Sequence, residues 1–188
     1  MDPFLAPLRL ATDHFVLRCY QPGDGAALRE AVSSSYEHLK TYMHWATPDQ
    51  TEEEAELTVR QLGGKYLTGE DYTMGIWAPD ESQLWGGTGF HLRDGPRVWR
   101  NAEIGMWIRA DRSNAGLGTQ VLTALLRWGF EEWPWQRVSW GCDPKNLASA
   151  RVAEKAGLTR EGLLRSQQQT VAGERRDTVL FACARPGS

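Results

Sequence analysis

The segment ADRSNAGLGT, residues 110–119, has the composition of a loop that could hold a phosphate group. Gly116 and Gly118 allow the backbone to turn tightly, to approach a ligand closely and to point several N–H groups into one space. The loop leads into an expected amphipathic helix at Thr119–Trp133, whose start adds the positive end of a helix dipole. The segment therefore indicates an anion site, for which a pyrophosphate is a natural ligand.

Two arginines accompany this loop. Arg109 and Arg112 stand before the glycines and could pair with phosphate oxygens. The motif is not a Walker loop, because no Gly-Lys-Ser or Gly-Lys-Thr follows, and it is not the G-x-G-x-x-G pattern of dinucleotide-binding folds. On spacing alone, an ordinary turn between a strand and a helix explains the glycines equally well.

Histidine and cysteine give no indication of a metal site or of a disulfide framework. The four histidines are scattered and show no paired spacing of the kind that metal ligands have. Cys19, Cys142 and Cys183 are an odd number without a C-x-x-C pair. We interpret them as small buried hydrophobic residues in a reducing cytoplasm.

The elements that position the loop follow from the spacing of apolar residues. Thr51 and Glu54 form a capping box before a helical pattern. Asn146 starts the last helix, and Gly157 is expected to end it. The other helices begin at Asp24 and Thr119, and the strands are expected at His14–Tyr20, Asp71–Ala78, Leu84–Leu92, Asn101–Ile108, Arg137–Cys142 and, as two strands joined by a turn at Ala172–Gly173, within Arg160–Ala184. This order predicts a mixed α/β sheet with helices on its faces.

Composition excludes several classes of protein. The chain has 188 residues, of which 41% are hydrophobic and 24% charged, as is typical of one globular domain spanning 1–188. The net charge of −3 argues against a nucleic-acid partner. No apolar run approaches the roughly 20 residues of a membrane span, and the first ten residues lack the features of a signal peptide. We therefore expect a cytoplasmic protein without membrane contact, whose nine tryptophans mainly pack in the core.

Beyond the loop, the sequence resembles the RimJ/RimL branch of the GNAT superfamily of acetyltransferases. Gly116-Leu117-Gly118 is similar to the core of the family's Q/R-x-x-G-x-G/A loop, although Ser113 stands at the Q/R position. The segments AEIGMWI, FEEWPWQRV, DPKNLASARVAEKAGL, REGLLR and RRDTVLFA occur in the family's order, and the match runs from about Phe15 to Ala184.

The resemblance implies a fold and a cosubstrate. The fold would be a central mixed, mostly antiparallel sheet of about seven strands with four helices and a core at about 15–184. Acetyl-CoA would lie in the cleft between the fourth and fifth strands. Its pantetheine arm would pair with the end of the fourth strand, at Met106–Ile108, and its pyrophosphate would lie on the loop Ser113–Thr119. The implied CoA-binding residues are Met106, Trp107, Ile108, Arg112, Ser113, Asn114, Ala115, Gly116, Leu117, Gly118, Thr119 and Asn146.

Three of the implied roles have plain structural alternatives. Glu103 could relay a proton from the amine through water, or it could form a partly buried salt bridge. Ser149 could protonate the departing thiolate, as a serine does in some RimL-like enzymes, or it could satisfy a backbone N–H in the first turn of a helix. Asn146 could contact CoA, cap its helix, or do both.

The sequence departs from the pattern at one catalytic position. Some relatives place a glutamate on the sixth strand, where this chain reads Ser166-Gln167-Gln168-Gln169. Glutamine is no base at neutral pH. Either Glu103 supplies the base through water, or the substrate amine arrives neutral, which is within reach because an α-amine has a pKa of roughly 8.

The resemblance leaves the acyl acceptor open. It implies that Tyr42, Trp45, His91 and Gln168 line the acceptor side. We expect an acetyl-CoA-dependent N-acetyltransferase that modifies a primary amine, in the first place a protein N-terminus. The alternatives are a small amine metabolite or an antibiotic, another acyl group, and a catalytically silent acyl-CoA-binding module. A homodimer is compatible with the sequence.

Overall fold

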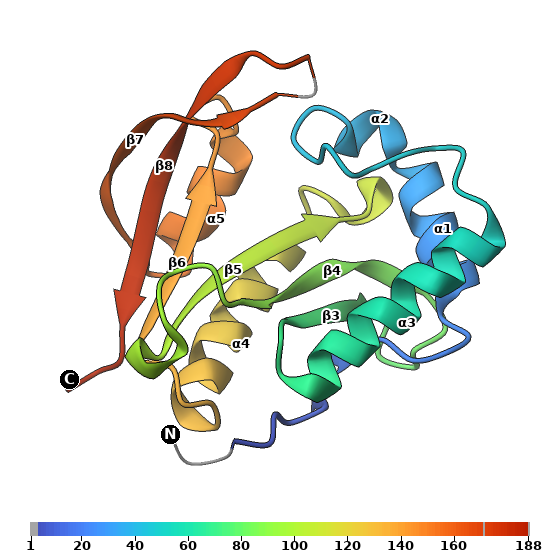
Figure 1. Ribbon diagram of the computed structural model, residues 1–188, viewed down its shortest axis with the longest axis horizontal. Helices are drawn as coiled ribbons and strands as arrows, with labels where there is room; N and C mark the ends of the chain where they lie inside the picture. The colour runs from blue at the N-terminus through green and yellow to red at the C-terminus, as the bar shows by residue number, and fades with distance from the viewer. Residues whose placement is uncertain (1–3, 171, 188) are drawn as a thin grey trace. The chain divides into compact units, whose positions relative to one another are not determined.

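The computed structural model describes residues 4–170 and 172–187. Their contacts divide the chain into two compact units (Figure 1). We name residues 4–90 and 106–113 the N-terminal unit, and residues 91–105 and 114–187 the C-terminal unit. Strand β5 (Asn101–Ile108) contributes its first part to the C-terminal unit and its last part, from Met106, to the N-terminal unit. A single domain with a core at about 15–184 stays a prediction.

The N-terminal unit is built on an antiparallel sheet. Its strands β1 (Arg9–Ala11), β2 (Val16–Cys19), β3 (Tyr72–Trp77) and β4 (Leu84–His91) are hydrogen-bonded in this order, and the last part of β5 follows β4. Helices α1 (Gly25–Ser34) and α3 (Glu52–Thr68) pack against each other, α2 (Tyr36–Leu39) follows α1, and the 3-10 turn η2 (Ala110–Arg112) follows β5. Leu17, Met74 and Ile76 are fully buried in the core of this unit.

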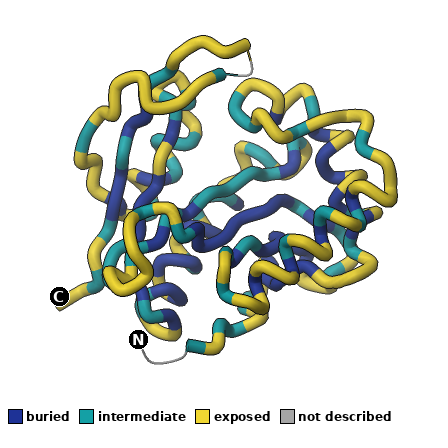
Figure 2. The backbone as a smooth tube through the Cα atoms, in the orientation of Figure 1, coloured by how far each residue is buried: buried dark blue, intermediate teal, exposed yellow. Residues whose placement is uncertain are grey.

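The C-terminal unit contains the other part of the sheet. The first part of β5 pairs in parallel with β6 (Arg137–Cys142), which pairs antiparallel with β8 (Arg175–Ala184), and β7 (Thr159–Gln169) forms the edge. Helices α4 (Leu117–Glu131) and α5 (Leu147–Lys155) contact each other, and the 3-10 turn η1 (Arg97–Trp99) precedes β5. Figure 2 shows β7 exposed along nearly its whole length.

Two of the predicted helix starts are confirmed. Helix α3 begins at Thr51, whose hydroxyl accepts a hydrogen bond from the Glu54 N–H while the Glu54 carboxylate accepts one from the Thr51 N–H. Helix α1 begins after Asp24, although the carboxylate of Asp24 does not cap it. The expected end of the last helix is also present, because Gly157 follows α5 with a φ of +89°. Local capping chemistry therefore fixes these boundaries as the sequence indicates.

The fold class is confirmed as mixed α/β with a mostly antiparallel sheet, but the element count differs. The described residues form eight strands and five helices, against about seven and four expected. The additional elements are β1 and α2, which have three and four residues and so carry too little periodicity to be recognised. Helix α4 begins at Leu117 and ends at Glu131, two residues before each predicted boundary, because Gly116 is its N-cap and Pro134 follows its end.

Most tryptophans and two cysteines are buried, as expected. Trp77, Trp128, Trp133, Trp135 and Trp140 are each at most 5% exposed. Cys19 and Cys142 are buried as well. Two tryptophans depart from this pattern, because Trp45 is 45% exposed and Trp99 is 61% exposed.

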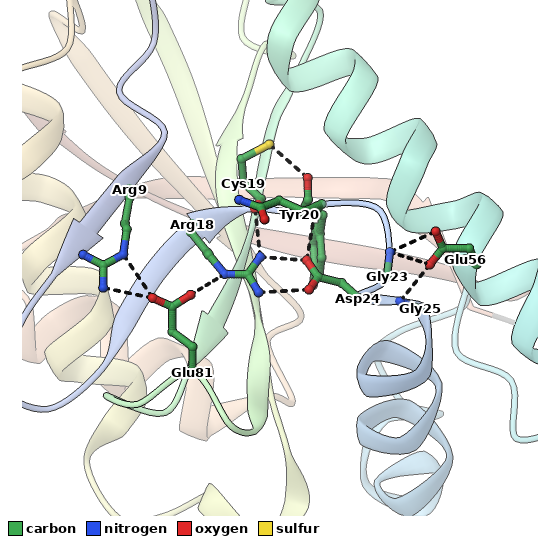
Figure 3. A network of polar contacts seen from close by, with 10 residues as sticks. Arg9, Arg18, Cys19, Tyr20, Gly23, Asp24, Gly25, Glu56 and Glu81 are labelled. Carbon is green, nitrogen blue, oxygen red and sulfur yellow. Dashed lines mark hydrogen bonds and ion pairs between the residues drawn. The ribbon is translucent and has the colours of Figure 1, made fainter.

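A network of ion pairs ties the first strands of the N-terminal unit together (Figure 3). The guanidinium of Arg18 donates two hydrogen bonds to the carboxylate of Asp24, at 2.7 and 2.9 Å, and one to Glu81 at 2.7 Å. It also donates to the carbonyl of Cys19 and lies 4.0 Å from the centre of the Trp77 ring. Every nitrogen of this buried arginine therefore has a partner, as burial of a charge requires.

Candidate active site

In the N-terminal unit, the last part of β5 packs closely against two glycines of β4, Gly86 and Gly87. A Cβ atom on Gly87 of β4 would come within 2.3 Å of the Trp107 indole nitrogen, and one on Gly86 within 2.2 Å of the Trp107 carbonyl oxygen. Both distances are shorter than side-chain atoms allow, so the two glycines provide the space that Trp107 occupies. Trp45 packs on Trp107 edge to face, with 5.7 Å between ring centres. Two aromatic side chains thus lie at the end of β5, where the resemblance implies the pantetheine arm.

Arg109 does not have the role that the sequence suggested. Its side chain is buried and forms ion pairs with Glu30, at 2.8 Å from one of its terminal nitrogens, and with Asp111, at 2.9 Å from Nε. The hydrogen bonds that Arg109 donates to Glu30, and then the one to Asp111, outweigh burial and raise the pKa of Arg109. The prediction of a phosphate contact from this side chain was wrong, because its N–H groups join α1 to η2. Glu30 lies 79 residues away in sequence, which no local pattern could show.

Arg112 remains available for an anion. It is exposed, stacks on Trp85 with 4.6 Å between its guanidinium carbon and the ring centre, and donates one hydrogen bond to Gln83 at 3.2 Å. An open pocket lies beside it, and its other lining residues are Ala78, Pro79, Asp80, Ser82, Gln83 and Trp85. The hydroxyl of Ser113 donates to the carbonyl of Ala110 at 2.7 Å, so this side chain serves the turn.

The start of α4 has the features of an anion site in the C-terminal unit. Asn114 and Gly116 both have left-handed backbone, with φ of +60° and +85°. Among the described residues no side chain caps α4, and no acidic residue lies in its first turn. The first N–H groups of a helix have no partner within it, so those of Leu117, Gly118 and Thr119 can bind an external anion. Asn114, Ala115 and Gly116 are exposed, so a ligand can reach this start.

Glu103 and the ring of His91 lie on the same face of β5, in the part of this strand that belongs to the C-terminal unit. Glu103 pairs with Ser139 in the parallel register, and its half-exposed side chain forms a long ion pair with Arg93, at 3.9 Å. Two residues along β5, and hence on the same face, a Cβ atom on Gly105 would come within 2.9 Å of the His91 ring. Gly105 therefore leaves room for the buried imidazole next to Glu103.

Ser149 is held by the end of β6. Its hydroxyl oxygen accepts a hydrogen bond from the Trp140 indole N–H at 3.0 Å, and its backbone N–H donates to the Asn146 side chain at 3.1 Å. The capping role of Asn146 is thereby confirmed, and a CoA contact from the same side chain stays a prediction. Burial raises the pKa of the Cys142 thiol, which a hydrogen bond with Ser149 lowers in part, so Cys142 is a protonated neighbour rather than a nucleophile.

A polar cluster that the sequence did not reveal lies at the ends of β6, β7 and β8. Gln168 accepts a hydrogen bond from Arg176 at 2.7 Å, and Arg176 faces Asp143 at 3.8 Å. Gln167 accepts one from Thr178 at 2.8 Å. The sequence predicts Ser166–Arg176 as one segment of the acceptor cleft, and Gln168 is the member of this group that it indicates individually. The positions of the other residues depend on a bulge in β7. This bulge arises from pairing with β8, so no local sequence pattern indicates it.

The predicted site residues fall into two groups. The N-terminal unit holds Tyr42, Trp45, Met106, Trp107, Ile108, Arg112 and Ser113, with Tyr42 half-buried after α2. The C-terminal unit holds His91, Glu103, residues 114–119, Asn146, Ser149 and Gln168.

Two further features bear on the class of protein. In the part of the chain that the structure describes, no three His, Cys, Asp or Glu side chains gather as metal ligands. Within the same part, no helix combines the length and the apolar character needed to cross a bilayer.

Comparison with known proteins gives a consistent result. Residues 14–159 match the acetyltransferase (GNAT) domain family. YnaD of Bacillus subtilis (strain 168), an uncharacterized N-acetyltransferase, is 28% identical over 160 residues, which cover 84% of this chain and 86% of YnaD.

Two solved structures show the same fold at low identity. RimL, a ribosomal α-N-protein acetyltransferase in complex with coenzyme A, is 20% identical with a TM-score of 0.84, and the match covers 95% of this chain and 98% of RimL. The microcin self-immunity acetyltransferase MccE, in complex with acetyl-CoA and AMP, is 17% identical with a TM-score of 0.82, and the match covers 92% of this chain and 93% of that one.

Proposed function

The chain belongs to the GNAT acetyltransferase family, and on this premise we propose that it acetylates the N-terminal α-amine of a protein. It is an N-acetyltransferase that uses acetyl-CoA as cosubstrate. The acceptor is the part that we propose, and the similarity to RimL supports it. We also propose that the protein acts in the cytoplasm and forms a homodimer.

The start of α4 is the observation that carries the use of acetyl-CoA. Its first N–H groups follow the left-handed Gly116, and within the described residues they have no side-chain cap and no acidic residue in the first turn. A pyrophosphate fits this chemistry, because it needs several N–H donors and a positive dipole end. Arg112 would add charge from the pocket beside η2, and the backbone of Met106–Ile108 would hold the pantetheine arm. When bound, acetyl-CoA supplies the activated acetyl group.

Glu103 is proposed to accept the proton of the amine through a water molecule. Its side chain is half-exposed, so water reaches it, and its single ion pair is long. His91 lies on the same face of β5 and positions this water or the amine. The ammonium form of an α-amine must lose one proton to become nucleophilic, and a pKa of roughly 8 makes this loss easy near neutral pH.

Ser149 is proposed to donate a proton to the sulfur leaving group. Because the Trp140 N–H donates to the serine oxygen, the hydroxyl of Ser149 becomes a stronger proton donor. The backbone N–H near Trp107 would stabilise negative charge that develops on the acyl oxygen, as preorganised donors do.

The experiment is to measure thiol release from acetyl-CoA with three acceptor classes. Peptides that begin with Ala or Ser, polyamines and aminoglycosides are compared at equal concentration. We expect turnover with the peptides, and a decrease in kcat of about 10²-fold in Glu103→Gln, in line with the loss of a general base. Glu161→Gln, a carboxylate paired with Arg137 in the same unit, is the control.

The possible results distinguish a protein acceptor from a small-amine acceptor and from the absence of acetyl transfer. Turnover with small amines only would overturn the protein acceptor and favour metabolite or antibiotic modification. Binding of acetyl-CoA without turnover on any acceptor would contradict acetyl transfer to these amines. An unchanged kcat in Glu103→Gln would remove Glu103 from the reaction while leaving the acceptor class intact.

A further inference from the structure

Arg176 is a largely buried arginine whose side-chain donors the described residues satisfy only in part. Its side chain is 16% exposed, and it donates one hydrogen bond, to Gln168 at 2.7 Å. Asp143 lies 3.8 Å away, which is an ion pair without a hydrogen bond. The buried Nε–H has no partner among the described residues. Since an arginine carries five N–H donors, most of its capacity is unused.

The neighbouring glutamines add further donors. The oxygen of Gln168 is occupied by Arg176, and the oxygen of Gln167 by the hydroxyl of Thr178. Each amide therefore presents its NH₂ group, which only donates. The hydrogen-bonding capacity that remains in these three side chains is thus mainly that of donors, which suits a ligand with acceptor oxygens.

The bulge in β7 keeps these side chains in place. Leu164 pairs with Thr178 and Gln168 with Arg176, so residues 165–167 of β7 stand opposite Asp177 alone. The Asp177 carboxylate accepts a hydrogen bond from the Ser166 N–H at 2.8 Å, and Ser166 has a φ of +51°. A left-handed serine costs backbone energy, and such strain is often kept where it serves a site.

The cluster lies at the same strand end as Ser149 but on the other face. Trp140 and Cys142 of β6 contact Ser149 on α5. Side chains alternate along a strand, so Gly141 and Asp143 point away from α5. A Cβ atom on Gly141 would lie 3.1 Å from the Thr178 methyl group, which places Thr178 on that opposite face. Substrates could therefore approach this strand end from both faces.

We propose that Arg176, Gln167 and Gln168 bind a carboxylate of the acyl acceptor, so that the enzyme selects amines that carry one. The inference rests on the proposed function and narrows its substrate class. The carboxylate can come from an acidic side chain near the N-terminus of a peptide, or from the α-carboxylate of a short acceptor. Asp143 balances the charge of Arg176 when the acceptor is absent.

Matched acceptors test the proposal. The peptide Ala-Glu-Ala-Ala-amide is compared with Ala-Gln-Ala-Ala-amide for the side-chain source, and Ala-Ala with Ala-Ala-amide for the terminal source. The enzymes are the parent, Arg176→Gln and the control Arg175→Gln, which changes the exposed neighbour in β8. The readouts are kcat and KM for each acceptor, and KM for acetyl-CoA. Calorimetric binding of the N-acetylated forms of the same peptides, in the presence of CoA, gives a readout that needs no turnover.

We expect the parent to prefer the carboxylate form of one pair by about tenfold or more, as charge-assisted hydrogen bonds do. Arg176→Gln loses this preference through KM, while Arg175→Gln keeps it and KM for acetyl-CoA stays within about twofold. Which pair shows the effect identifies the source. Equal use of both members of each pair by the parent, or a preference that survives Arg176→Gln, would overturn the proposal. If no amine is acetylated, the proposed function fails, and the calorimetric arm alone decides whether the carboxylate site exists.

Discussion

Two regions of this molecule each bury an arginine, and they treat its charge in opposite ways. In the N-terminal unit, Arg18 gives hydrogen bonds to Asp24, Glu81 and a backbone carbonyl (Figure 3). In the C-terminal unit, Arg176 gives one hydrogen bond and leaves its Nε–H without a partner in the described residues. Their side chains are similarly buried, at 11% and 16% exposed.

The difference distinguishes Arg18, which stabilises the fold, from Arg176, which we propose binds a ligand. A buried charge is tolerated when its partners are complete, and removal of such a charge leaves the partners stranded. A buried charge with incomplete partners costs free energy in the unbound protein, and a ligand can recover this cost. The number of satisfied donors, more than the degree of burial, therefore indicates which arginine is functional.

The largest effect should come from Arg18→Met. Loss of the guanidinium leaves the Asp24 carboxylate largely buried without a counter-charge, and we expect the free energy of unfolding to fall by about 3–5 kcal/mol. Urea unfolding measures this change. Arg176→Gln should cost no more than about 1 kcal/mol, because Gln168 and Asp143 lose little hydrogen bonding. Equal losses in the two variants would break the comparison.

A matched control lies in the same network. Arg9 also binds Glu81, at 2.9 Å, but its side chain is 50% exposed. Arg9→Met should therefore lower the free energy of unfolding by at most about 1 kcal/mol, as exposed pairs do. A loss as large as that of Arg18→Met would mean that burial of the pair is not what matters.

A smaller effect should come from acid. Burial acts to raise the pKa of Glu81, but hydrogen bonds and charges from Arg9 and Arg18 outweigh it and hold this pKa below its ordinary value of 4.5. A pKa lowered on folding adds stability above the unfolded value, and that stability is lost as pH falls through the folded value. We expect the free energy of unfolding to decrease below about pH 4.5, and to decrease less steeply in Glu81→Gln. Urea unfolding at a series of pH values measures both slopes, and parallel slopes would exclude Glu81.

The smallest effect should come from Arg112→Gln. This arginine differs from both Arg18 and Arg176 because its side chain is exposed. Arg112 makes one hydrogen bond to Gln83 and one aromatic contact to Trp85. If it adds charge to the phosphate site, KM for acetyl-CoA should rise several-fold, with kcat unchanged and a weaker salt dependence. Arg127→Gln, on the exposed side of α4, is the control. Identical KM values in the two variants would limit the phosphate site to backbone donors.

The fold was predictable where the determining chemistry is local. The capping box at Thr51 and Glu54, the glycine after α5 and the strand Asn101–Ile108 each depend on residues close in sequence, and the structure has all of them. The short elements β1 and α2 were missed, because three or four residues hold no period. Their formation depends on contacts with β2 and α1, which only the folded chain supplies.

The site divides along the same line. The glycine-rich start of α4 was readable, because glycine and a helix start are features of contiguous residues, and its use as an anion site stays a prediction. Arg109 was read incorrectly, since its partner Glu30 comes from another element. Arg176 was not singled out, because its incomplete set of hydrogen bonds follows from the register of β7 and β8. Backbone-built sites are thus visible in one sequence, whereas side-chain sites depend on pairing between distant segments.

The close packing of Trp107 against Gly86 and Gly87 has a consequence for how this protein can diverge. Any side chain at Gly87 would overlap the indole, and a smaller residue in place of Trp107 would leave a void above β4. Each single change is therefore unfavourable, while a joint change from glycine and tryptophan to two medium residues could conserve the volume. Among proteins descended from this chain, positions 87 and 107 should therefore change together or not at all. The shape of the surface at the end of β5 should then differ between lineages by such paired substitutions.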